Sequence, residues 1–107
     1  MDGRNFVHEL CRHGRKDLIP DFVEEFKNYE PVDLFHARTC GGETPIMMAI
    51  QSRDVETVQL CIDLGMYVAD DTDYMGRSYQ EQAKYYCAGQ VGMAMCAAFD
   101  AANGPLI

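Results

Sequence analysis

The sequence predicts an all-α domain in which about three helix-turn-helix units stack in a row. Apolar residues recur at the three- and four-residue spacing of amphipathic helices, in segments that are too short to fold alone. Short polar breaks separate paired segments, and Gly3, Gly42 and Gly76 precede successive pairs. We place the units at about residues 3–36, 38–70 and 72–102, within one domain that covers residues 1–107.

The central unit carries the clearest helix signals. Thr44 is a residue type that caps helix N-termini through its side-chain oxygen, and Pro45 suits the first helical position because no N–H is needed there. One apolar stripe follows within residues 46–50, and a second apolar period begins at Val55. Gly65 favours the left-handed conformation that ends a helix. We therefore expect two short antiparallel helices joined by a tight turn.

The segment Thr44-Pro45-Ile46-Met47-Met48-Ala49 resembles the T-P-L-H-x-A signature of the ankyrin-repeat family. It departs from that signature at Met47, where the family has His, and Arg53 stands at the usual inter-helix Gly. The residues that stand where the family usually has Glu, Val, Leu, Leu and Gly are Glu56, Val58, Leu60, Ile62 and Gly65. The resemblance implies an ankyrin-repeat solenoid of about three repeats, in which each repeat packs on its neighbours.

The first unit is a degenerate version of the same pattern. His8 falls on the family's His position and Gly14 on its inter-helix Gly. Its second helix is expected to run from about Leu18 to Tyr29, before an extended connection over residues 30–41.

The third unit begins with a hairpin turn at residues 73–76, and Gly76 lies 34 residues after Gly42. Ser78 takes the capping position of a helix that is expected over residues 79–88. A second helix is expected from residue 90 or 91 to residue 101.

Composition and charge restrict the partners and the compartment. The formal net charge is −8, which argues against binding to nucleic-acid phosphates or to an anionic membrane surface. No apolar run is long enough to span a bilayer, so direct membrane insertion is not expected. The five cysteines lack paired spacing and indicate reduced thiols. We therefore expect a cytoplasmic protein, and an organelle or a cytoskeletal assembly also fits this reasoning.

Three candidate chemistries are weighed against structural explanations. His8, Cys11 and His13, with His36 and Cys40 downstream, lack the spacing of zinc modules. We favour a turn hydrogen bond for His8, a core position for Cys11 and a solvent-facing position for His13. Residues 71–76 begin like a calcium loop, but the fifth and twelfth positions lack the required carboxylates. Cys40 is the expected exposed thiol, and a thiol redox protein remains a remote alternative. We expect no metal, no cofactor and no catalytic residue.

Exposed aromatic residues gather in the third unit. In ankyrin folds the hairpin tips and the first helices line a concave surface, where the resemblance places Tyr74, Tyr85 and Tyr86. Tyr, Met and Arg are enriched in protein interfaces. The expected partner-binding residues on this side are Arg12, His13, Glu43, Gln51, Ser52, Tyr74, Met75, Arg77, Tyr85 and Tyr86.

The last predicted helix suggests a second interaction surface. Between residues 91 and 102 the only charged side chain is Asp100. Met93 and Met95 must point apart, because successive helical residues are separated by about 100°. We expect Met93, Met95 and Phe99 to pack against another chain. The predicted function is non-catalytic protein binding, as a small adaptor or as an accessory subunit of a larger assembly. The alternative is a free-standing inhibitor or regulator of one partner protein.

Overall fold

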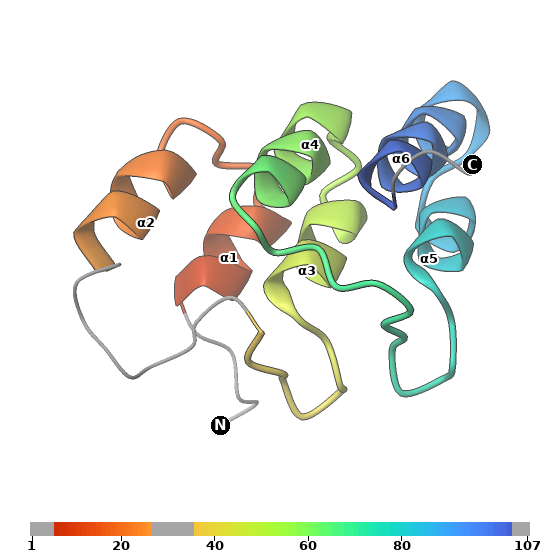
Figure 1. Ribbon diagram of the computed structural model, residues 1–107, viewed down its shortest axis with the longest axis horizontal. Coiled ribbons are helices and arrows are strands. Elements are labelled where there is room, and N and C mark those ends of the chain that lie inside the picture. The colour runs from red at the N-terminus through yellow and green to blue at the C-terminus, as the bar shows by residue number, and fades with distance from the viewer. Residues whose placement is uncertain (1–5, 27–35, 104–107) are drawn as a thin grey trace.

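The computed structural model describes residues 6–26 and 36–103, which form six helices and no strand. Helices α1, α3 and α5 lie in one row, and α2, α4 and α6 lie in a second row beside it (Figure 1). The connection between α4 and α5 and the described segment before α3 project from the same side of the molecule (Figure 1). The helices are α1 (Phe6–Arg12), α2 (Ile19–Phe26), α3 (Pro45–Gln51), α4 (Val55–Asp63), α5 (Tyr79–Tyr86) and α6 (Gly89–Ala102). The predicted all-α class is confirmed.

Helix α3 is the centre of the core. It packs against α1, α4 and α5, and every residue from Pro45 to Ile50 is buried. Helix α4 turns Val58 and Cys61 into the same core, as predicted, whereas Ile62 is only half-buried. Burial on all sides explains why α3 carries apolar residues around its whole circumference rather than along one stripe.

The same turn occurs twice, 34 residues apart. In the first, the Thr39 amide donates to the Glu43 carbonyl over 2.9 Å, and in the second the Asp73 amide donates to the Arg77 carbonyl over 3.0 Å. The side-chain oxygens of Thr39 and Asp73 each accept two further backbone N–H groups within their own turn. The glycine that closes each turn has φ of 80° at position 42 and 78° at position 76. The predicted equivalence of Gly42 and Gly76 is therefore confirmed in backbone geometry.

Two side-chain caps were predicted at helix N-termini, and the structure confirms the one at Ser78 and contradicts the one at Thr44. Ser78 accepts from the Glu81 amide, and the Glu81 side chain accepts from the Ser78 amide, which makes a reciprocal capping box. Thr44 has the extended backbone of a cap, but its hydroxyl makes no capping hydrogen bond. That hydroxyl oxygen is buried without a partner. The expected side-chain cap at Thr44 is wrong, because the hydroxyl is packed away from the free N–H groups of α3.

The turn between α3 and α4 has Arg53 where the family pattern has glycine. Gly14, between α1 and α2, has φ of 63°, and Arg53, between α3 and α4, has φ of 64°. Residues with a side chain adopt this left-handed conformation only at a cost in free energy. Arg53 therefore occupies a backbone position that is best suited to glycine, as the comparison with the family pattern suggested.

The helix bounds agree with the expected ones to within two residues where they can be compared. Helix α5 ends at Tyr86 rather than at residue 88, because Cys87 adopts an extended backbone. The expected continuation of α2 to Tyr29 and most of the connection over 30–41 lie outside the described residues. In the described part of the chain, no helix combines the length and the apolar character that crossing a bilayer requires.

Candidate functional site

The tyrosine surface consists of Tyr74, Met75, Arg77, Tyr85 and Tyr86. The first two lie in the turn before α5, and the two adjacent tyrosines end that helix. Tyr74, Met75 and Tyr85 are 75%, 63% and 69% exposed. Covering these side chains with a partner would remove their apolar surface from water, which favours binding.

Arg77 holds the tyrosine surface together. Its guanidinium carbon lies 4.4 Å from the ring centroid of Tyr85 and 5.7 Å from that of Tyr86. The two rings meet edge to face, with centroids 4.9 Å apart. From the other side, Arg77 Nε donates to the buried carboxylate of Asp73 over 2.9 Å, and this hydrogen bond raises the pKa of Arg77. A cation fixed on one side by a carboxylate and stacked on an aromatic ring gives the surface a defined shape.

The predicted partner-binding residues of the central unit make hydrogen bonds within the chain. The Gln51 amide donates to the Glu43 carboxylate, and the Ser52 hydroxyl donates to the Ala49 carbonyl. All three are half-buried. Part of the polar capacity of these predicted partner-binding residues is therefore used within the chain.

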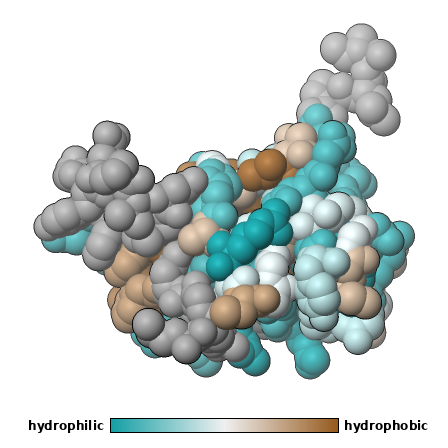
Figure 2. Space-filling model, turned by 90° about the horizontal axis from the view of Figure 1, so that it is seen from below, coloured by the Kyte–Doolittle hydropathy of each residue, from teal (hydrophilic) through white to brown (hydrophobic). Residues whose placement is uncertain are grey.

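The predicted residues in the first repeat lie at its far end. Arg12 and His13 are exposed at the end of α1, on the other side of α3 from α5. The side of the molecule with the projecting turns is a mixture of hydrophilic and hydrophobic residues rather than one apolar area (Figure 2). The structure therefore brings Arg77, Tyr85 and Tyr86 into contact, places Tyr74 and Met75 in the turn that holds Arg77, and leaves Arg12 and His13 apart from them.

In helix α6, only part of the second predicted surface, which consists of Met93, Met95 and Phe99, is exposed. Met95 and Phe99 are fully buried, so the expectation that they contact another chain is wrong. Phe99 stacks on Tyr79 with ring centroids 4.9 Å apart, and this aromatic pair packs α6 onto the start of α5. Met93, by contrast, is 73% exposed. The predicted divergence of Met93 and Met95 is confirmed, but it is Met93 alone that remains outside.

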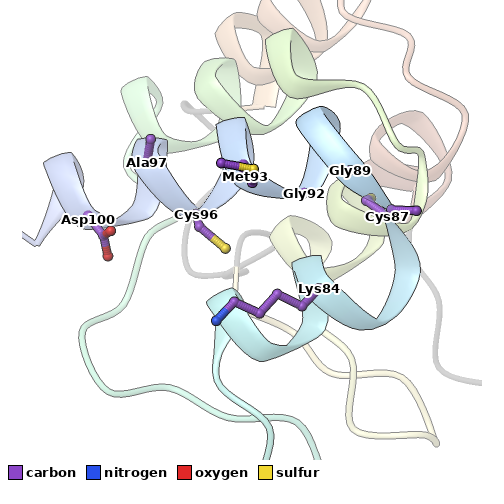
Figure 3. A pocket seen from close by; sticks show the side chains of 9 residues that line it. Lys84, Cys87, Gly89, Gly92, Met93, Cys96, Ala97 and Asp100 are labelled. Carbon is purple, nitrogen blue, oxygen red and sulfur yellow. The ribbon is translucent and has the colours of Figure 1, made fainter.

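An open groove of about 540 Å³ lies beside the exposed Met93, between α5 and α6 (Figure 3). Its lining is mostly apolar, with Lys84 and Asp100 as its charged members. The lining residues are Lys84, Cys87, Ala88, Gly89, Gly92, Met93, Cys96, Ala97 and Asp100. At Gly92 the backbone of α6 comes close to the end of α5, because a Cβ there would lie 2.6 Å from the Cys87 carbonyl oxygen.

The candidate metal ligands of the first repeat have structural roles. His8 is buried, and its Nε2 lies 2.9 Å from the Glu43 carbonyl oxygen, which links α1 to the turn before α3. Cys11 is buried in the core and His13 is exposed, as we favoured from the sequence. Among residues 6–26 and 36–103, no three His, Cys, Asp or Glu side chains are arranged to hold a metal ion.

The acidic side chains of the turn before α5 also make ion pairs within the chain. Asp71 pairs with Arg38, and Asp73 pairs with Arg77. Arg38 further donates to the Gly42 carbonyl over 2.7 Å and to the Thr72 carbonyl over 3.1 Å. One arginine thus bridges the two equivalent turns, a contact that no local sequence pattern indicates.

No protein-family model matches the chain, and no curated protein matches its sequence significantly. The function is therefore inferred from the residues and geometry described above.

Proposed function

We propose that this chain is a non-catalytic protein-binding module of the ankyrin-repeat type, and that its partner binds across the tyrosine surface. The turn that recurs after 34 residues supports the repeat assignment, together with the signature at residues 44–49. The paired helices in two rows support it as well (Figure 1). A small adaptor or an accessory subunit of a larger protein assembly fits this arrangement.

The observation that carries the proposal is the stacking of Arg77 between Asp73 and Tyr85. Binding normally requires ordering of interface side chains, at about 0.5–1.5 kcal/mol for each long side chain. Here Arg77 is already held by a 2.9 Å hydrogen bond and by the Tyr85 ring at 4.4 Å. A partner that covers the exposed rings therefore gains apolar burial with little further ordering. Tyr and Arg residues in this situation are the ones that most often dominate binding energy.

Paired alanine substitutions test the proposal. The tagged chain is captured from its own cells with a chemical cross-linker, and the cross-linked partner is quantified by mass spectrometry. We expect Tyr85→Ala with Tyr86→Ala to reduce the recovered partner at least tenfold, with helicity by circular dichroism unchanged. The matched control is Leu18→Ala, which removes an exposed apolar side chain outside the tyrosine surface. Equal recovery from the double variant and the control would contradict the proposal, and a loss of helicity would show that the rings support the fold.

A second mode of binding rests on a different observation. Met93 is 73% exposed beside the groove between α5 and α6, at the end of the row of helices (Figures 1 and 3). This end favours the accessory-subunit form of the proposal, in which another chain covers α6 permanently. Met93→Glu in the same capture experiment separates the two modes. A partner lost with Met93→Glu but kept with the tyrosine double variant would assign binding to α6, whereas a free-standing inhibitor that uses the tyrosine surface would show the reverse.

A further inference from the structure

Two buried thiols from different repeats touch each other. Cys11 in α1 and Cys61 in α4 have Sγ atoms 3.5 Å apart, and both residues are fully buried. Fifty positions separate them in the chain, so only the packing of the first repeat against the second brings them together. Both are present as thiols. Neither takes part in the tyrosine surface or in the groove beside α6.

We infer that Cys11 and Cys61 are a latent disulfide pair, which ties α1 to α4 when a small-molecule disulfide such as oxidised glutathione oxidises the chain. A disulfide has an S–S length of about 2.05 Å, so the two sulfurs must approach by roughly 1.5 Å. Rotation about each Cα–Cβ bond moves the sulfur alone and can supply much of that approach. Two of the other cysteines point elsewhere: Cys87 towards the Ile50 carbonyl and Cys96 towards the Gln80 carbonyl.

The reaction is an ordinary thiol–disulfide exchange in two steps. One cysteine, as the thiolate, attacks a sulfur of oxidised glutathione and displaces one glutathione thiolate, which takes up a proton. The second cysteine then attacks the protein sulfur of the mixed disulfide and displaces the second glutathione. The two protein thiols lose two protons and two electrons, and oxidised glutathione takes up both and becomes two reduced glutathione molecules.

Burial determines when the exchange can occur. The hydrogen bond with Cys11, and then burial itself, raise the pKa of the Cys61 thiol well above its usual range, so it stays protonated while the repeats are closed. The oxidant must therefore act when α1 separates transiently from its neighbours. This separation has to break the packing of α1 against α2 and α3, so we expect the exchange to be slow in the folded chain.

Peptide mapping can identify this link without ambiguity. Trypsin cleavage after Arg4, Arg12, Arg53 and Arg77 places Cys11 on peptide 5–12 and Cys61 on peptide 54–77, with no other cysteine on either. The full chain carrying Cys40→Ser, which removes an exposed thiol, is incubated with oxidised glutathione. It is then alkylated with N-ethylmaleimide and digested. We expect a linked species of peptides 5–12 and 54–77, formed faster in sub-denaturing urea because opening limits the reaction.

The stability of the oxidised chain provides an independent readout. We expect its urea midpoint to exceed that of the reduced chain, and dithiothreitol to abolish the difference. Cys11→Ser and Cys61→Ser should each remove both the linked peptide and the shift, whereas Cys96→Ser should retain them. Absence of the linked peptide in buffer and in sub-denaturing urea would overturn the inference. So would a lower midpoint in the oxidised chain, or a predominant link to the peptide that carries Cys87 and Cys96.

Discussion

Replacing Gly92 by alanine should destabilise this protein, although alanine is the better helix former. A Cβ at position 92 would lie 2.6 Å from the Cys87 carbonyl oxygen and 3.3 Å from the Ala83 carbonyl oxygen. Both are backbone atoms at the end of α5, so no side-chain rotation relieves the contact, and α6 must shift away from α5. Overpacking of this kind costs about 1–3 kcal/mol, and we take the upper end because backbone opposes it. The gain in helix propensity offsets about 1 kcal/mol.

The expected net loss is therefore about 2 kcal/mol, which corresponds to a fall in Tm of roughly 10 °C for a chain of this size. Urea and thermal unfolding followed by circular dichroism measure it. Ala94→Gly calibrates helix propensity on the same helix, because Ala94 is exposed, and it should lose about 1 kcal/mol. If Gly92→Ala instead raises the midpoint by the amount that Ala94→Gly lowers it, propensity alone governs the position. The close approach of α6 to α5 would then be wrong.

Two further predictions concern buried hydroxyl groups. Thr44→Val keeps the shape of a side chain whose oxygen has no partner, so the free energy of unfolding should stay equal or rise by up to about 1 kcal/mol. A loss of more than about 1 kcal/mol in urea unfolding would reveal a hydrogen bond from that hydroxyl. Burial, and then the nearby Asp71 charge, raise the pKa of Tyr79, whose hydroxyl donates to Asp71 over 3.2 Å. Above about pH 10 the Tyr79 hydroxyl ionises in the unfolded chain but stays neutral in the folded chain. The unfolded state then holds fewer protons than the folded state, so the free energy of unfolding falls as the pH rises above about 10. Tyr79→Phe should reduce this alkaline decline between about pH 9 and pH 11, and an unchanged decline would contradict the assignment.

The sequence was sufficient for features that depend on neighbours along the chain. The apolar period, Pro45 and the glycines located the helix pairs, and Ser78 located the start of α5, where the structure adds the reciprocal bond from Glu81. These features are local because they depend on backbone conformation and on hydrogen bonds within one turn. The exposure of Tyr74 and Tyr85 was also predictable, once the turns and the first helices were placed in register.

Features that depend on packing between helices far apart in the sequence were harder to predict. Helical geometry required Met93 and Met95 to point apart, but only the packing of α6 against α4 and α5 decides that Met95 is the buried one, with its Sδ 3.7 Å from the Cys87 Sγ. The same holds for Phe99, which the Tyr79 ring covers. Thr44 has the composition and backbone of a cap, yet the direction of its hydroxyl is set by its surroundings in the core. The approach of Cys11 to Cys61 joins two repeats, and no spacing in the chain encodes it.

The bridge between the two equivalent turns has a mechanical consequence. Arg38 bonds the Gly42 carbonyl, the Thr72 carbonyl and Asp71, and a Cβ at Gly42 would lie only 3.0 Å from the Cβ of Tyr74. A force applied at Tyr74 therefore acts on the turn before α3 as well as on the turn that carries Tyr74, because these contacts join the two turns. Separating the two turns has to break these contacts. Tyr74 thus lies in a turn that is joined directly to the turn before α3.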